Sequence, residues 1–185
     1  MVKGERRMKL KLWLKLETIG IIVTFILGIF LHYSIIISNM SIWAIVFGSV
    51  NQSIWEHAKS FSMPYIIWSF IELCVIRLPF KKFVVSKIIG LYSLVIGVIL
   101  SLSIYLGLIG NHSFILDVAV SFIFIFIAYA VSYKLATSKY HLEELFVISL
   151  LMLVLFLSMY LTFSFVPPKI NLFLDYTKGS YGISL

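Results

Sequence analysis

Five ionisable side chains lie within or beside apolar stretches of this sequence, which makes them the candidates for chemistry. They are His32, Glu56, His57, His112 and Asp117. An ionisable group in apolar surroundings is costly unless it is paired or hydrated, so each is a functional-site candidate by default. Asp117 is the strongest candidate, because a carboxylate early in an apolar helix must face protein, be protonated or hold a cation.

Three imidazoles and two carboxylates within reach of one another would suit a zinc site. In that hypothesis His32, His57 and His112 are the ligands, and Asp117 or Glu56 activates a water molecule. The same groups would equally suit a proton relay or a hydrogen-bonded plug without chemistry. The spacing does not decide among these, because the sequence has no His-x-x-x-His or His-Glu-x-x-His pair. Zinc therefore remains an open possibility, and the cofactor is otherwise unknown.

Other polar residues have structural interpretations. Ser53 and Glu56 fit the Ser-x-x-Glu capping box that begins a helix, so Glu56 is either a cap or an acid–base group. Glu72 is expected to pair with Arg77 or with a neighbouring helix. Asp175 either folds back over the site or occupies an exposed turn. A nucleophilic serine is disfavoured, because no Gly-rich turn indicates an oxyanion hole.

The composition requires lipid as the solvent of most side chains. Of the 185 residues, 61% are hydrophobic and 12% are charged, and the mean hydropathy is +1.06. A soluble domain of this size could not bury so much apolar surface. The net charge of +7 does not indicate nucleic acid, because the basic residues flank apolar runs. The expected partner is the lipid bilayer.

The lengths of the apolar runs predict an all-α fold with a single transmembrane domain over residues 1–185. Five transmembrane helices are expected, at residues 17–38, 62–78, 84–108, 113–133 and 145–165. The stretch 42–50 is too short to cross a bilayer and is predicted to be re-entrant or interfacial. Helices are the only plausible spanning elements here, because backbone groups in lipid must be satisfied within the segment.

Charge placement gives the expected orientation. With the N-terminus inside, all basic residues except Lys59, Lys169 and Lys178 fall on the cytoplasmic side. A sixth span over 42–61 would move the basic cluster near Lys81 outside, so five spans are favoured. Residues 1–16 then form a cytoplasmic N-terminus, 17–165 the helical bundle and 166–185 an extracytoplasmic tail. All five candidate residues fall in the outer half of the membrane.

Several separated segments carry a resemblance to a known family. They are Leu31-His-Tyr, Ser49-Val-Asn-Gln-Ser-Ile-Trp-Glu-His-Ala-Lys, Gly107-Leu-Ile-Gly-Asn, Leu116-Asp, Pro167-Pro, Asp175 and Tyr181-Gly-Ile. Together they resemble a family of small bacterial membrane proteins known only as a domain of unknown function. That family has a pattern like Val-Asn-Glu-Ser-x-Trp-Glu-His-x-Lys, in which Gln52 here replaces the glutamate. The resemblance implies a fold and a bacterial cell membrane, without an assigned activity.

A weaker resemblance is to the seven-helix membrane hydrolases of the alkaline ceramidase and adiponectin receptor group. Those proteins bind zinc through intramembrane histidines near a serine and an aspartate, residue types that Ser53, His57, His112 and Asp117 supply. The predicted helices are too few for that group, and His141 stands alone on the opposite side. The likeness is an analogy of residue types.

Three functions remain open from the sequence, so whether the protein is an enzyme is not decided. The first is a non-enzymatic membrane protein whose polar cluster supports the fold or an interface with a second copy or another membrane protein. The second is a zinc-dependent hydrolase of a lipid or peptide at the outer leaflet. The third is a small ion- or proton-coupled carrier that titrates Asp117 and Glu56. Five helices are few for a monomeric transporter, so a carrier would require an oligomer.

Overall fold

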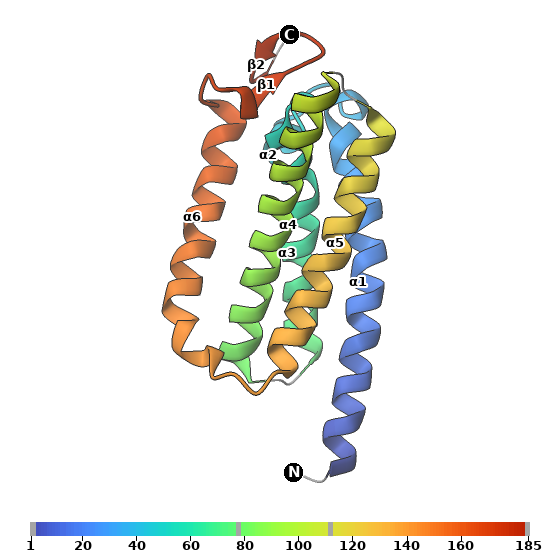
Figure 1. The fold of residues 1–185 in the computed structure, drawn as a ribbon, viewed down its shortest axis with the longest axis vertical. Helices are drawn as coiled ribbons and strands as arrows, with labels where there is room; N and C mark the ends of the chain where they lie inside the picture. Colours follow the sequence, from blue (N-terminus) through green and yellow to red (C-terminus); the bar gives the residue numbers. More distant parts are fainter. Residues whose placement is uncertain (1–2, 77–78, 111–112, 184–185) are drawn as a thin grey trace.

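The computed structural model describes residues 3–76, 79–110 and 113–183, and this part of the chain is all-helical apart from one small hairpin (Figure 1). The elements are α1 (Lys3–Ile37), α2 (Ile42–Phe47), α3 (Ile54–Val75), α4 (Phe80–Ile109), α5 (Phe114–Thr137), the 3₁₀ turn η1 (Leu142–Leu145), α6 (Phe146–Phe165), the 3₁₀ turn η2 (Asn171–Phe173), β1 (Leu174–Asp175) and β2 (Ser180–Tyr181).

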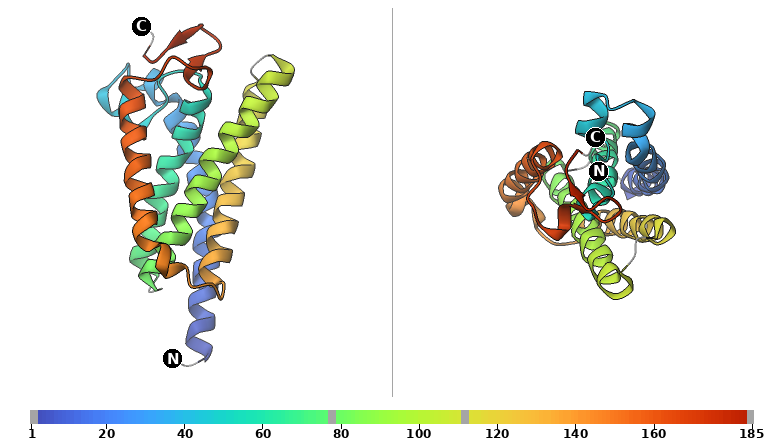
Figure 2. Two further views of the ribbon diagram at one scale, coloured as in Figure 1. Left: turned by 60° about the vertical axis from the view of Figure 1, so that its left-hand side comes forward. Right: turned by 90° about the horizontal axis from the view of Figure 1, so that it is seen from above.

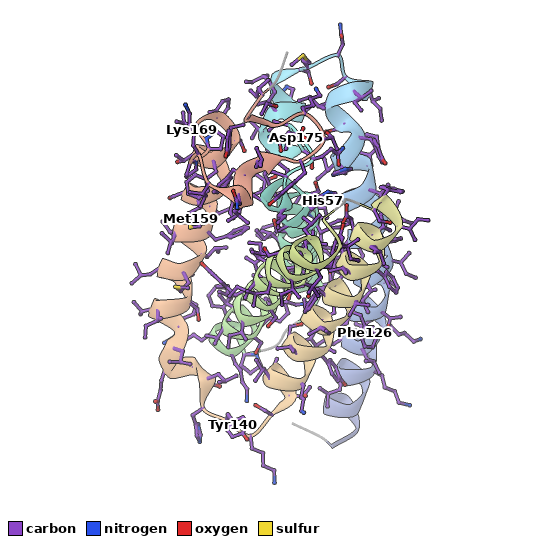
Figure 3. All side chains as sticks on the ribbon, turned by 45° about the horizontal axis from the view of Figure 1, so that its top comes forward. His57, Phe126, Tyr140, Met159, Lys169 and Asp175 are labelled. Atoms are coloured by element: carbon purple, nitrogen blue, oxygen red, sulfur yellow. The ribbon has the colours of Figure 1, made fainter. Side chains whose placement is uncertain are left out.

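Within the described ranges, four segments are long and apolar enough to cross a membrane. They are Leu10–Ile37 of α1, the whole of α4 and α5, and Leu142–Phe165, which joins η1 to α6. Large hydrophobic side chains such as Phe126 project outward from them, as expected of helices that face lipid (Figure 3). The prediction of an all-α fold is confirmed, and four of the five predicted spans fall on these apolar helices.

α3 differs from those four helices because it is polar. It carries Glu56, Lys59 and Glu72, and every residue from 53 to 62 is buried. The helix packs against α1 and α4 and also contacts α5. These three side chains face protein, whereas Ile67, Phe70 and Val75 of the same helix are exposed. A side chain that faces protein can be ionisable where a lipid-facing one could not. The predicted span 62–78 overlaps the second part of α3, which ends at Val75, and residues 77 and 78 of that span lie outside the described ranges.

The two ends of the chain lie at opposite ends of the bundle (Figures 1 and 2). α1 runs from Lys3, well before the predicted start of the first span, and its first turns extend beyond the other helices. α2 and the hairpin lie together at the other end. The re-entrant or interfacial position predicted for 42–50, which contains α2, stays a prediction.

The tail after α6 folds back over the first turn of α3. α6 ends at Phe165, the predicted end of the last span, and the hairpin pairs Leu174 with Tyr181. The Trp55 ring of α3 lies 5.6 Å from the ring of Phe173, between centroids. The Asn51 side chain donates a 3.0 Å hydrogen bond to the carbonyl of Gly182. The tail therefore closes this end of the bundle.

Glycines allow α1 and α3 to pack closely. A Cβ atom at Gly20 would collide with the Trp68 ring, and one at Gly28 would collide with the Phe61 ring. The two glycines are eight residues apart, so they lie on one face of α1. This close approach brings the polar side chains of α1 within reach of those on α3.

Candidate functional site

The predicted site residues come from helix ends that meet at the C-terminal end of the bundle. His32 lies in the last turns of α1, and Asp117 lies in the first turn of α5. Ser53 begins α3 by accepting a 3.4 Å hydrogen bond from the backbone N–H of Glu56, which places His57 in the following turn. His57 points into the bundle, and Asp175 of the tail lies toward the same end (Figure 3).

His32, His57 and Asp117 form one buried group. Nε2 of His57 lies 3.5 Å from Oδ2 of Asp117. The imidazoles of His32 and His57 are stacked, with ring centroids 4.6 Å apart and planes inclined by 19°. All three side chains are almost wholly shielded from solvent. The convergence of these three residues, expected from their depth along the predicted spans, is present in the structure.

Both ring nitrogens of His32 are engaged. Nδ1 is hydrogen-bonded to the hydroxyl of Ser49 at 3.0 Å, and Nε2 is hydrogen-bonded to Oε1 of Gln52 at 3.1 Å. The Ser49 hydroxyl is also within hydrogen-bonding distance of the Ser60 hydroxyl and of the Glu56 carbonyl. Imidazole exchanges protons between its nitrogens and such neighbours, so His32 is joined to the hydroxyl groups of Ser49 and Ser60, while its contact with His57 is through the stacked ring faces.

Asp117 has a further partner that the sequence did not indicate. The Tyr105 hydroxyl of α4 donates a short hydrogen bond to Oδ1 of Asp117, and it accepts one of 3.3 Å from the backbone N–H of Ser113. Asp117 is thus held between Tyr105 on one side and His57 on the other. Tyr105, Asp117 and His57 therefore lie in consecutive polar contact, and the ring of His32 stacks on that of His57.

A small cavity adjoins these side chains. Its volume is about 10 Å³, and it is lined by His32, His57 and Asp117 together with apolar side chains. The rings of Tyr33 and Phe114, 6.1 Å apart between centroids, lie at its wall between α1 and α5. A space of this size with three polar groups is suited to a single water molecule. That water would bridge proton donors and acceptors within the group.

Glu56 is engaged elsewhere. Its Oε2 accepts hydrogen bonds from Nζ of Lys59 at 2.9 Å and from the backbone N–H of Val50 at 3.0 Å. The backbone N–H of Ser53, which a capping box would give to Glu56, donates instead to Asn51. Only the serine half of the predicted capping box therefore forms. The structure does not bring the Glu56 carboxylate into the group of His32, His57 and Asp117.

Asp175 holds the tail on the loop before α3. Its carboxylate accepts hydrogen bonds from the Thr177 hydroxyl at 2.6 Å, and from the backbone N–H groups of Thr177, Lys178 and Gln52 at 2.8, 3.2 and 3.3 Å. Burial raises the pKa of Asp175, but these hydrogen bonds together lower it by more than burial raises it. The pKa of Asp175 therefore lies below its ordinary value. Of the two expectations for Asp175, the structure shows the one in which the residue folds back. Its carboxylate binds the loop before α3, through the backbone N–H of Gln52.

A second buried polar group lies in the other half of the bundle. The sequence indicated only that Glu72 would pair with Arg77, which lies outside the described ranges, or with a neighbouring helix, as it does. Nζ of Lys87 on α4 binds Oε1 of Glu17 on α1 at 2.8 Å and also forms an ion pair with Glu72 of α3. The hydroxyl of Ser132 on α5 donates to Glu17, and the indole N–H of Trp68 donates to Glu72. Lys87 was expected among the cytoplasmic charges; it is instead buried.

The described residues do not form the zinc site that the residue types allowed. Among them, no three His, Cys, Asp or Glu side chains are arranged to hold a metal ion. His112, the third expected ligand, lies outside the described ranges. His32 would have to give up the hydrogen bond to Ser49 or to Gln52 before a metal ion could bind. The geometry fits proton exchange more closely than metal binding.

The sequence matches one family model over nearly its whole length. Residues 3–183 match the model of DUF6512, described as a family of unknown function. No curated protein and no solved structure matches the chain.

Proposed function

We propose that this protein, which belongs to the DUF6512 family of unknown function, is an integral membrane protein that binds and transfers protons at its buried His32–His57–Asp117 group. The observation that carries the proposal is the buried 3.5 Å contact between Nε2 of His57 and Oδ2 of Asp117, beside the hydrogen bond from Tyr105 to Asp117 and the stacked ring of His32. A general proton-transfer role needs groups that alternate between donor and acceptor, and imidazole and carboxylate do so most readily.

α3 supplies the fifth span in this proposal. Its 22 residues are about 33 Å long at about 1.5 Å per residue, close to the thickness of a hydrocarbon core. Its ionisable groups are all paired inside protein, which removes the usual objection to a charged span. An odd number of spans agrees with chain ends at opposite ends of the bundle.

The charge distribution supports an N-terminus in the cytoplasm. Exposed lysines at the N-terminal end of the bundle include Lys81, Lys134 and Lys139, beside the basic first turns of α1. The opposite end carries Lys169 and Lys178. Lys87 is buried and does not contribute to the surface charge, but the N-terminal end still carries more basic residues than the opposite end. The His32–His57–Asp117 group then lies in the extracytoplasmic half of the membrane.

The orientation of the two imidazole rings favours proton transfer over metal-dependent hydrolysis. Stacked rings direct their nitrogens along their own planes, toward Asp117 in one case and toward Ser49 and Gln52 in the other. Ligands of one metal ion would instead converge on a common point. The adjoining cavity of about 10 Å³ has room for a water and none for a lipid or peptide.

The test is a coupled titration of His57 and Asp117. Protein with ¹⁵N-labelled histidine is placed in lipid nanodiscs, and the imidazole signals are followed by NMR from acid to alkaline pH. The His57 signal is assigned by its loss in His57→Gln. We expect the midpoint of His57 to move in Asp117→Asn, because a proton shared between the two groups belongs to the pair.

The exposed residue His141 serves as the internal control of that titration. Its midpoint is expected to be the same in the wild type and in Asp117→Asn, since it lies near the opposite end of the bundle. A His57 midpoint that does not respond to Asp117→Asn would overturn the proposal. One that moves together with His141 would also count against it, because the change would then be global.

A further inference from the structure

We propose that the cluster of Glu17, Glu72 and Lys87 is a second proton-binding site, which holds one proton on a carboxyl group in the other half of the bundle. The inference rests on the proposed function, because it adds a second site to the same proton path. Its three members come from α1, α3 and α4, and Ser132 of α5 completes it. The cluster therefore brings together residues that are far apart in sequence, with separations between 15 positions (Glu72 and Lys87) and 115 positions (Glu17 and Ser132).

The charge balance of the cluster carries the inference. Two carboxyl groups bind one ammonium group, and all three side chains are buried. A dry interior penalises an isolated charge strongly, whereas one carboxylate with one ammonium is a neutral pair. The second carboxyl group reaches neutrality by holding a proton. Glu56 and Lys59 illustrate the contrast, because they form a pair of one acid and one base that needs no extra proton.

The other groups facing the cluster do not alter that balance. The Tyr129 ring of α5 and the Tyr65 ring of α3 face Nζ of Lys87, with centroids 4.8 and 5.6 Å away. The Tyr65 hydroxyl donates to the Lys87 carbonyl, and the Trp68 indole donates to Glu72. Aromatic faces stabilise the ammonium, and neutral donors stabilise the carboxylate, without supplying a second positive charge.

A cavity adjoins the Lys87 side of the cluster. A space of about 140 Å³ between α3 and α4 is lined by Lys87, Tyr65 and Ser69, together with apolar side chains that reach Leu153 of α6. Its accessible surface is apolar, and a water molecule needs polar partners, so the cavity does not by itself hydrate the cluster. The position of Glu72 near the end of α3, and of Lys87 near the start of α4, places the cavity toward the N-terminal end of the bundle.

An apolar layer separates the two polar groups. The Phe61 ring of α3 stacks on the Phe25 ring of α1, with centroids 6.4 Å apart and planes inclined by 12°. The Phe122 ring of α5 meets Phe25 edge-on at 5.0 Å. Below this layer, the hydroxyls of Thr24 and Tyr129 are hydrogen-bonded at 2.7 Å. The arrangement is that of two proton-binding sites on either side of an apolar barrier.

Infrared spectroscopy tests the second site directly, because a protonated carboxyl group has its own C=O stretching band. In reconstituted protein near neutral pH we expect that band in the wild type. Glu17→Gln and Glu72→Gln should each abolish it, because the remaining carboxylate then pairs with Lys87 alone. Lys87→Met should about double it, since both carboxyl groups must then be neutral. If Lys87→Met does not fold, the two glutamine variants decide by themselves.

The same experiment separates this inference from the proposed function. Asp117→Asn is expected to leave the band unchanged, because Asp117 belongs to the other group. A wild type without the band, or a band that survives both glutamine variants, would overturn the second site and leave the His57 titration untouched. A band removed by Asp117→Asn would also overturn it, by assigning the protonated carboxyl to the first group.

Discussion

Tyr105, near the end of α4, and Asp117, in the first turn of α5, are joined by a hydrogen bond. The bond is buried on the Asp117 side, and it fixes the carboxylate at the first turn of α5, within reach of His57. Asp117 therefore does not face lipid, which agrees with the expectation that a carboxylate in this apolar run must face protein. The first prediction follows from this contact.

Replacing Tyr105 by phenylalanine should lower the free energy of unfolding by about 2 kcal/mol, because a hydrogen bond to a buried charged group is lost. Thermal unfolding in detergent measures the change. Ser158→Ala is the matched control, since that hydroxyl is exposed and bonds only to Val154 in its own helix. In Asp117→Asn, the further effect of Tyr105→Phe should shrink; two fully additive effects would show that the residues are not coupled.

The lengths of the apolar runs and the residue types within them predicted the apolar helices and the His32–His57–Asp117 group. The apolar stretch 84–108 lies within α4, and the stretches 113–133 and 145–165 lie within α5 and α6 except for their first residues. The reason is that lipid imposes a strong and uniform requirement on helix length and composition. The meeting of His32, His57 and Asp117 agrees with the expectation that they converge.

The second polar group was not predictable in the same way. Lys87 lies at the edge of an apolar run, where a lysine is usually a loop charge at the membrane surface. α4 begins at Phe80, so Lys87 is already two turns inside the helix, and its ammonium meets carboxylates from two other helices. Pairings over such sequence separations depend on helix packing, which the periodicity of one segment does not contain. Glu56 and Lys59, three residues apart on one helix, did offer a local signal.

The tail should loosen in acid. The pKa of Asp175 is lower in the folded protein than in the unfolded chain, so its contribution to stability is fully present above the unfolded value of about 4. That contribution is lost as the pH falls from there through the lower folded value. Hydrogen–deuterium exchange over 174–181 measures it, and protection should fall below about pH 4 in the wild type.

Asp175→Asn gives the control for that experiment. It should show weaker protection at neutral pH, because the hydrogen bonds to Thr177 and Gln52 lose a charged acceptor, and little further change in acid. An equal acid response in the wild type and in Asp175→Asn would show that another group controls the tail.

Cysteine labelling tests the orientation. In a Cys74→Ser background, the exposed positions Lys178 and Lys139 are each replaced by cysteine. A membrane-impermeant maleimide should label Lys178→Cys in intact cells and label Lys139→Cys only after the membrane is opened. The expectation rests on five spans with the basic end inside. Labelling of both positions from outside, or protection of Lys178→Cys, would contradict that topology.

Removing the Phe61 ring should open the barrier between the two polar groups. Phe61→Ala leaves a cavity between Phe25 and the level of His57, and water in that space would connect groups that the aromatic layer now separates. Proteoliposomes with an entrapped pH indicator should therefore acidify several-fold faster with Phe61→Ala than with the wild type under an imposed potential. Phe126→Ala, which removes an outward-facing ring, controls for the lost aromatic volume. Adding Asp117→Asn to Phe61→Ala should slow the leak, whereas a leak indifferent to Asp117 would mean that protons pass by another route.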